Sequence, residues 1–242
     1  MTIADPLGLF TYMKKIAILI DGGFLLKRLP TVCPQIERHN SSAVSASISR
    51  LVTAHLKNQN KVIRAPHARS LLYRVFYYDA QPYLEKGHYP VSHKSINYGQ
   101  TAEAKFRLSL FDELRKRANT AVRLGEVRKE RSWILNELPQ KELLSGKRTV
   151  ADLTDDDFAP GLRQKAVDMR IGLDIASITL KKQADTIILV AGDADFVPAA
   201  KLARREGVKI ILDPLWRSVA KDLYEHIDGV SSGFPNPSKS ND

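Results

Sequence analysis

The stretch Lys15-Ile16-Ala17-Ile18-Leu19-Ile20-Asp21 is a short aliphatic run with no polar alternation, which is typical of a buried parallel strand. Gly22 and Gly23 follow it and predict a turn. A helix is expected from near Phe24 to just before Pro30. A strand without a polar face must be covered on both sides, so this stretch already favours a layered α/β fold.

The rest of the chain continues the alternation of strands and helices. We expect strands over 71–78, 121–127, 186–191 and 208–212, and helices over 42–58, 102–118, 161–182, 196–206 and 215–225. This order predicts a three-layer α/β domain, a parallel sheet with helices on both faces.

The chain is expected to form a single domain over 14–229, with an N-terminal extension over 1–13. Loop-rich insertions are expected near 80–100 and 128–160, and a disordered tail over 230–242, which is rich in Gly, Pro, Asn and Ser. The first twelve residues lack the basic start of a signal peptide, and the apolar runs are too short to span a bilayer.

The 242 residues are 43% hydrophobic and 26% charged, with a formal net charge of +10. That surplus favours a polyanionic partner, although a solubility role explains the charge equally well. The single cysteine, Cys33, cannot form an intramolecular disulfide, and we expect a cytoplasmic protein.

Four expected strands end in an aspartate, at Asp21, Asp79, Asp193 and Asp213. Parallel sheets build their sites at the carboxyl ends of strands, so these side chains share one edge. Any one of them can be a turn former or a helix cap, but four together favour a site.

The helix expected over 161–182 adds a fifth carboxylate to this edge. A helix that connects two parallel strands runs antiparallel to them, which places its start at their carboxyl edge. Asp168 lies early in this helix, whereas Asp174 lies roughly 9 Å further from the edge. Asp168 therefore joins Asp21 and Asp193 as a candidate site residue. The plainer interpretation is that Asp168 is only a solvated residue on the surface of this helix.

Carboxylates brought together repel one another unless a hard cation such as Mg²⁺ or Mn²⁺ neutralises them. Gly192-Asp193-Ala194-Asp195-Phe196 is the most informative stretch, because Asp193 and Asp195 follow a buried strand. Asp195 can also cap the next helix, which would explain it equally well. A metal-bound acidic pocket on a basic chain is typical of a nuclease.

Two further groups of side chains are candidates for contact with RNA. Arg163, Lys165 and Arg170 neighbour Asp168 in the sequence and are expected to bind phosphates. Tyr83, Tyr89 and Tyr98 could stack on unpaired bases, although packing of the loop on the domain is the plainer interpretation.

Three motifs together resemble the NYN domain family of the PIN-like nuclease superfamily. They are Ile20-Asp21-Gly22-Gly23-Phe24, Arg163-Gln164-Lys165-Ala166-Val167-Asp168 followed by Gly172-Leu173-Asp174, and Val190-Ala191-Gly192-Asp193-Ala194-Asp195-Phe196. The resemblance runs from about residue 14 to 229. It implies the strand order 3-2-1-4-5 and Mg²⁺- or Mn²⁺-dependent cleavage of RNA.

Carried over by position, the resemblance implies that Asp21, Asp168 and Asp193 are catalytic metal ligands. Asp195 is implied as a further ligand or orienting group and Asp174 as a secondary acid, and we add Asp79 as another secondary acid. We expect RNA as the partner, no membrane association and no small-molecule organic cofactor, and a homodimer is compatible with the sequence.

This chain departs from the family pattern at two positions. Phe24 stands where the family often has Asn, and Ala191 where it often has Ser or Thr. Both replacements remove a polar group that could orient a carboxylate or water, so a non-catalytic RNA-binding or regulatory module is the alternative. A haloacid-dehalogenase-type phosphatase is disfavoured because Gly23 occupies the position of its second Asp. A receiver domain is disfavoured because Arg128 and Lys129 follow the third strand.

Overall fold

The computed structural model describes residues 2–4, 10–12 and 14–239. Its centre is a seven-stranded sheet in the order β11-β10-β9-β3-β4-β7-β8. The strands are β3 (Ile16–Asp21), β4 (Leu72–Ala80), β7 (Thr120–Leu135), β8 (Phe158–Lys165), β9 (Thr186–Val190), β10 (Lys209–Asp213) and β11 (Gly229–Val230). All neighbours are parallel except β7 and β8, which are antiparallel. The five strands β7-β4-β3-β9-β10 lie side by side in this order. If these five alone are numbered along the chain, the order reads 3-2-1-4-5.

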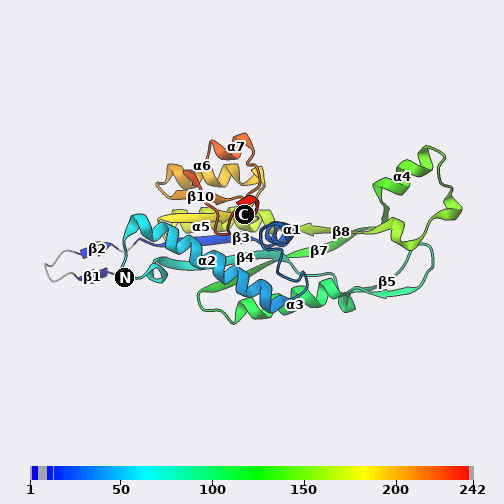
Figure 1. Ribbon diagram of the computed structural model, residues 1–242, viewed down its shortest axis with the longest axis horizontal. Coiled ribbons are helices and arrows are strands. Elements are labelled where there is room, and N and C mark those ends of the chain that lie inside the picture. Colours follow the sequence, from blue (N-terminus) through cyan, green and yellow to red (C-terminus); the bar gives the residue numbers. More distant parts are fainter. Residues whose placement is uncertain (1, 5–9, 13, 240–242) are drawn as a thin grey trace.

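Helices cover both faces of this sheet, as predicted (Figure 1). One face carries α1 (Gly22–Val32), α2 (Ser41–Ile63) and α3 (Ala102–Arg115), and the other carries α5 (Val167–Leu180), α6 (Val197–Arg205) and α7 (Lys221–Tyr224). Strand β3 serves both cores, because Ile18 packs with the first group and Leu19 with the second. Its lack of polar alternation follows from this double burial.

Beyond the sheet edge, β7 and β8 continue together as an antiparallel arm, residues 126–165, that carries α4 (Glu137–Leu144) at its end (Figure 1). The insertion near 80–100 contains a second hairpin, β5 (Lys86–His88) with β6 (Ser95–Asn97), that packs on the arm. The prediction of a loop-rich insertion was therefore wrong for much of 128–160, whereas 80–100 is mostly loop apart from the two short strands. Strand pairing between residues about thirty positions apart leaves little local signal.

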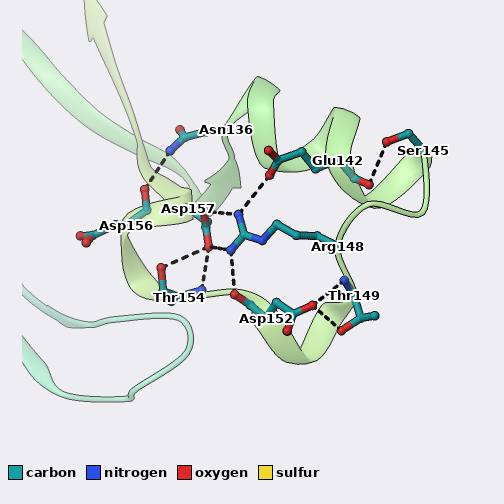
Figure 2. Close-up of polar contacts among 9 residues, drawn as sticks. All are labelled: Asn136, Glu142, Ser145, Arg148, Thr149, Asp152, Thr154, Asp156 and Asp157. Atoms are coloured by element: carbon teal, nitrogen blue, oxygen red, sulfur yellow. Dashed lines mark hydrogen bonds and ion pairs between the residues drawn. The ribbon is translucent and has the colours of Figure 1, made fainter.

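The end of the arm is held by a polar network centred on Arg148 (Figure 2). Arg148 donates to both carboxylate oxygens of Asp157 at 3.0 and 2.7 Å and to the backbone oxygen of Asp152 at 2.7 Å. Asp157 also accepts from Thr154, and Glu142 on α4 lies 3.3 Å from Arg148. Short 3-10 turns stand in this region at Val150–Asp152 and Asp155–Asp157.

The helix predicted over 161–182 begins only at Val167, and the prediction was wrong for 161–166. Residues 158–165 form β8 instead. Pro160 disfavours a helix there, and an edge strand such as β8 tolerates it. A Cβ on Gly161 would overlap with the backbone of Arg131, so this glycine allows the two strands of the arm to approach closely.

The predicted disordered tail is also partly wrong. Phe234 is buried in the core, and its backbone oxygen accepts a hydrogen bond from Trp216 at 2.9 Å. Residues 240–242 lie outside the described residues, as do residues 1, 5–9 and 13 of the predicted N-terminal extension. Two short strands, β1 (Thr2–Ala4) and β2 (Phe10–Tyr12), pair antiparallel within that extension. Within the described ranges, no helix has the length and apolarity needed to cross a membrane.

Candidate acidic active site

Asp21 stands at the end of β3 and caps helix α1. Its side chain accepts a hydrogen bond from the backbone N–H of Phe24 at 3.0 Å. Burial raises the pKa of the Asp21 carboxyl to about 6, and repulsion from Asp168 and Asp79 adds to the increase. The protein therefore holds Asp21 where its negative charge is poorly solvated, which is common in functional sites.

Asp168 is the second residue of α5, at the start of the helix as predicted. The chain enters α5 through Ala166 in the left-handed conformation, with φ of 66°. This corner lies against Gly125 of β7, where a Cβ would overlap with the backbone oxygen of Lys165 and lie 2.9 Å from Val167 Cγ2. A glycine in β7 thus allows the close approach that positions Asp168.

Asp168 is exposed overall, but partial burial of its carboxyl raises the pKa of this group. The negative charges of Asp193 and Asp195 raise the pKa further. Asp168 thus interacts electrostatically with Asp21 of β3 and with the two aspartates that follow β9. We call Asp21, Asp168, Asp193 and Asp195 the acidic edge. Its members come from three separate parts of the sequence.

Asp193 and Asp195 are both exposed on the short turn after β9. Asp193 caps this turn, since its Oδ1 accepts from the backbone N–H of Asp195 at 3.1 Å. The residue before α6 is Phe196, so Asp195 does not cap that helix. Pro198 lies in the first turn of α6, where a missing N–H does no harm.

The chemistry of the acidic edge fits a hard divalent cation, because its members offer carboxylate oxygens and such an ion would stabilise the charged forms of Asp21 and Asp168, whose pKa values are raised. In the described part of the chain, however, no three His, Cys, Asp or Glu side chains lie close enough together to hold a metal. Convergence of Asp21, Asp168 and Asp193 on one point therefore stays a prediction. Exposed aspartates can reach other rotamers at low cost, so a bound ion could gather them.

Phe24 occupies the space between the ends of β3 and β9. Its ring packs on Gly192, where a Cβ would overlap with the ring edge. Ala191, the other departure from the family pattern, is fully buried. An apolar contact therefore lies beside Asp193 at the position where the family often has an amide.

Three of the other aspartates have structural partners. Asp79 is buried and forms an ion pair with Arg107 of α3, and Tyr77 donates to it at 3.4 Å. Asp174 accepts from Tyr78 at 2.8 Å and lies 3.2 Å from Arg123. These contacts give Asp174 partners outside the acidic edge, while Asp79 is close enough to raise the pKa of Asp21.

Asp213, the last of the four predicted strand-end aspartates, is completely buried. It accepts hydrogen bonds from His55 Nε2 at 2.8 Å, from the backbone of Leu215 and Gly233 at 2.8 Å each, and from Ser232 at 3.0 Å. All of these partners are structural, so Asp213 connects α2, β10 and the C-terminal segment.

Two of the three predicted phosphate-binding residues, Arg163 and Lys165, lie on a strand and not on the expected helix. Arg163 and Lys165 stand two positions apart on β8, and both pair with Glu130 of β7, at 3.6 and 2.5 Å. Arg170 is exposed on the first turns of α5. The sequence analysis missed Arg107. The i,i+4 spacing of Glu103 and Arg107 is compatible with their ion pair, but the contact of Arg107 with Asp79 depends on the packing of α3.

Comparisons with known proteins agree with this architecture. Residues 114–228 match the model of the NYN domain. An uncharacterized protein of Methanocaldococcus jannaschii is 26% identical over 80 residues, which are 32% of this chain and 33% of the relative. The similarity thus spans about a third of that relative's length. No solved structure matches the chain significantly.

The matched range includes Asp168, Asp193 and Asp195 but begins after Asp21. Strand β3 reaches the same edge because it pairs with β9 over Ile16–Ile20. Residues 114–228 therefore match the NYN domain, which belongs to a PIN-like nuclease family.

Proposed function

We propose that this protein is a metal-dependent ribonuclease that hydrolyses RNA phosphodiester bonds at the acidic edge. The observation that supports this most directly is the place of Asp168 at the start of α5, where electrostatic repulsion links its carboxyl to Asp21 and to Asp193 and Asp195. The NYN domain supports a nuclease, and the metal and the catalytic residues are our proposal.

In this proposal Asp21, Asp168 and Asp193 hold Mg²⁺ or Mn²⁺, and Asp195 assists them. Such an ion, when bound, supplies an activated water and stabilises negative charge on the phosphoryl group. Asp21 is partly buried and caps α1 through its hydrogen bond from the Phe24 N–H, so it provides the fixed ligand. The three exposed aspartates provide adjustable ones.

The RNA backbone would lie on the basic side chains beside this edge. Arg163 and Lys165 share a single acidic partner, Glu130, so the cluster keeps a positive surplus. Arg170 adds a third cation near Asp168, and the net charge of +10 favours any polyanion. Surface ion pairs of this kind are weak and exchange readily with phosphates.

The test is cleavage of single-stranded and structured RNA by the purified protein with Mn²⁺ or Mg²⁺ and with EDTA. Asp168→Asn and Asp193→Asn should each reduce cleavage at least about a hundredfold, a typical loss for a group that stabilises charge in the transition state. Asp112→Asn, on the exposed side of α3, is the matched control and should cleave normally. Absence of metal-dependent cleavage across a broad panel of RNA and DNA would rule out the proposal.

A non-catalytic RNA-binding module is the second candidate, and the Phe24–Gly192 contact favours it. An apolar ring beside Asp193 cannot orient water or a carboxylate. This candidate predicts salt-sensitive RNA binding that Asp193→Asn leaves unchanged or strengthens. Loss of RNA turnover in that variant would exclude it.

We also propose a cytoplasmic location, which is supported by the single cysteine, Cys33, buried as a free thiol. A homodimer stays a prediction. It is supported by exposed apolar side chains along α5, at Met169, Leu173 and Leu180. Leu173→Glu should shift the mass in light scattering toward the monomer if this face is the interface.

A further inference from the structure

A groove of about 570 Å³ lies between the insertion after β4, the start of α3 and the β7–β8 arm. We call it the aromatic groove. Its ring-bearing lining residues are Tyr83, Tyr89, Tyr98, Trp133 and Phe158. The volume falls within the range of small-molecule sites, roughly 300–1,000 Å³, and is large enough for a nucleoside.

The rings of this groove are fixed by contacts with each other and with the backbone. Tyr83 meets Tyr98 edge to face at 5.2 Å, and Tyr89 stacks on Trp133 at 5.7 Å with 24° between the planes. The indole N–H of Trp133 donates to the backbone oxygen of His88 at 2.9 Å, which fixes the orientation of the ring. The groove therefore presents preorganised aromatic surfaces.

The segment that carries Tyr89 is itself anchored to the arm. Asp155 accepts hydrogen bonds from the backbone of Val91 at 3.0 Å and from the hydroxyl of Ser92 at 2.5 Å. Both rings of the stacked pair, Tyr89 and Trp133, are thus held in place by contacts of their own. The open space between this pair and Tyr83 is not needed to hold them. Tyr83, Tyr89 and Trp133 all remain partly exposed.

The aromatic groove leads toward the acidic edge. Glu103 and Arg107 line both this groove and a smaller neighbouring one, whose lining includes Gly23. A Cβ placed on Gly23 would lie 3.4 Å from Asp21 Oδ1 and 4.0 Å from the side-chain oxygen of Gln164, which lines the aromatic groove. Asp21 and Gln164 therefore both lie near the same point beside Gly23, which places this end of the aromatic groove close to Asp21.

We propose that the aromatic groove binds an unpaired nucleobase of an RNA strand whose backbone passes the acidic edge. This inference rests on the proposed function and specifies its substrate as single-stranded RNA. Aromatic rings are good stacking partners for bases, and such stacking tolerates any sequence. Arg107 offsets Glu103, and Asp155 and Asp156 leave the lining acidic, so the groove suits a neutral base while the phosphates stay on the cations outside.

Tryptophan fluorescence tests this directly, because the chain has two tryptophans. Trp216→Phe leaves Trp133 as the sole reporter and keeps a ring at a position outside the groove. In EDTA, a uridine oligonucleotide should quench Trp133 on binding. A backbone of the same length without bases should bind at least about tenfold more weakly and quench little, since stacking would be lost.

Tyr89→Leu should weaken binding of the uridine oligonucleotide about tenfold, whereas Tyr89→Phe, which keeps the ring, should bind normally. Circular dichroism melting curves should match for the two variants, which shows that both fold. Equal affinity for the oligonucleotides with and without bases, or unchanged binding by Tyr89→Leu, would overturn the inference.

The same data separate this inference from the proposed function. Base-dependent quenching without Mn²⁺-dependent cleavage would leave the aromatic groove as a base-binding site and refute the nuclease. Cleavage that is abolished by Asp168→Asn, together with equal binding of the two oligonucleotides, would refute the groove alone.

Discussion

The ring of Phe24 packs so closely on Gly192 that no Cβ fits at residue 192. Phe24 also donates its backbone N–H to Asp21, so one residue contacts the ends of both β3 and β9. Phe24 and Gly192 are thus a coupled pair. The family often has Asn at residue 24, and in this chain an apolar ring takes the place of that side-chain amide beside Gly192.

This coupling predicts the outcome of a double-mutant cycle. Gly192→Ala should destabilise the protein by about 1–3 kcal/mol through overpacking against the ring. In the background of Phe24→Ala the same change should cost less, by about 1 kcal/mol or more, because the clash is gone. Urea unfolding curves of the four proteins provide the measurement, and strictly additive effects would show that the two residues are independent.

The raised pKa of Asp21 predicts a stability that decreases with pH in EDTA. The folded state binds the Asp21 proton up to about pH 6, whereas the unfolded chain releases it near 3.8. The free energy of unfolding should therefore fall between about pH 4 and 6, and Asp21→Asn should be more stable than wild type at pH 7.5, by about 1–3 kcal/mol.

Asn retains the helix cap that Asp21 provides, so the variant isolates the charge. Asp112→Asn is the control and should show no such gain. Mn²⁺ should stabilise the wild type above pH 6 and have a smaller effect on Asp21→Asn. If the free energy of unfolding of the wild type instead rose from pH 4 to 6 relative to that of Asp21→Asn, the raised pKa of Asp21 would be contradicted.

Asp213 should behave as a structural residue. Asp213→Ala leaves His55 and the backbone of Gly233 buried without their acceptor, and we expect a loss of about 3–5 kcal/mol. Asp213→Asn keeps part of the network and should lose less. Chemical denaturation measures both, and RNA cleavage per folded molecule should stay at the wild-type level. A loss of activity without a loss of stability would show that Asp213 takes part in catalysis.

The network at the end of the arm predicts a local effect (Figure 2). Arg148→Ala removes the bidentate contact with Asp157 and the bond to Asp152, so backbone amides over 137–157 should exchange with solvent about tenfold faster. The melting temperature should barely change, because the arm end lies outside both hydrophobic cores. Lys141→Ala, which breaks only an exposed pair with Glu137, should leave exchange unchanged.

The sequence by itself determined the layered sheet and the positions of Asp21 and Asp193. The aliphatic runs over 16–20 and 187–190 are buried on both sides, so the residues of each strand by themselves indicate that it is covered on both faces. An aspartate that follows such a strand stands at the carboxyl edge whatever packs around it. Chain direction likewise indicated that the early part of α5, with Asp168, lies toward that edge, although the helix begins at Val167 and not at 161.

Only the tertiary structure decided which aspartates pair with side chains of distant elements. The contacts of Asp79 with Arg107, of Asp174 with Tyr78 and of Asp213 with His55 join residues 28 to 158 positions apart, and no local period encodes them. The arm, the aromatic groove and the Phe24–Gly192 contact arise in the same way. Hydrophobic periodicity specifies which face of an element is buried, whereas the partner of each side chain depends on how distant elements pack together.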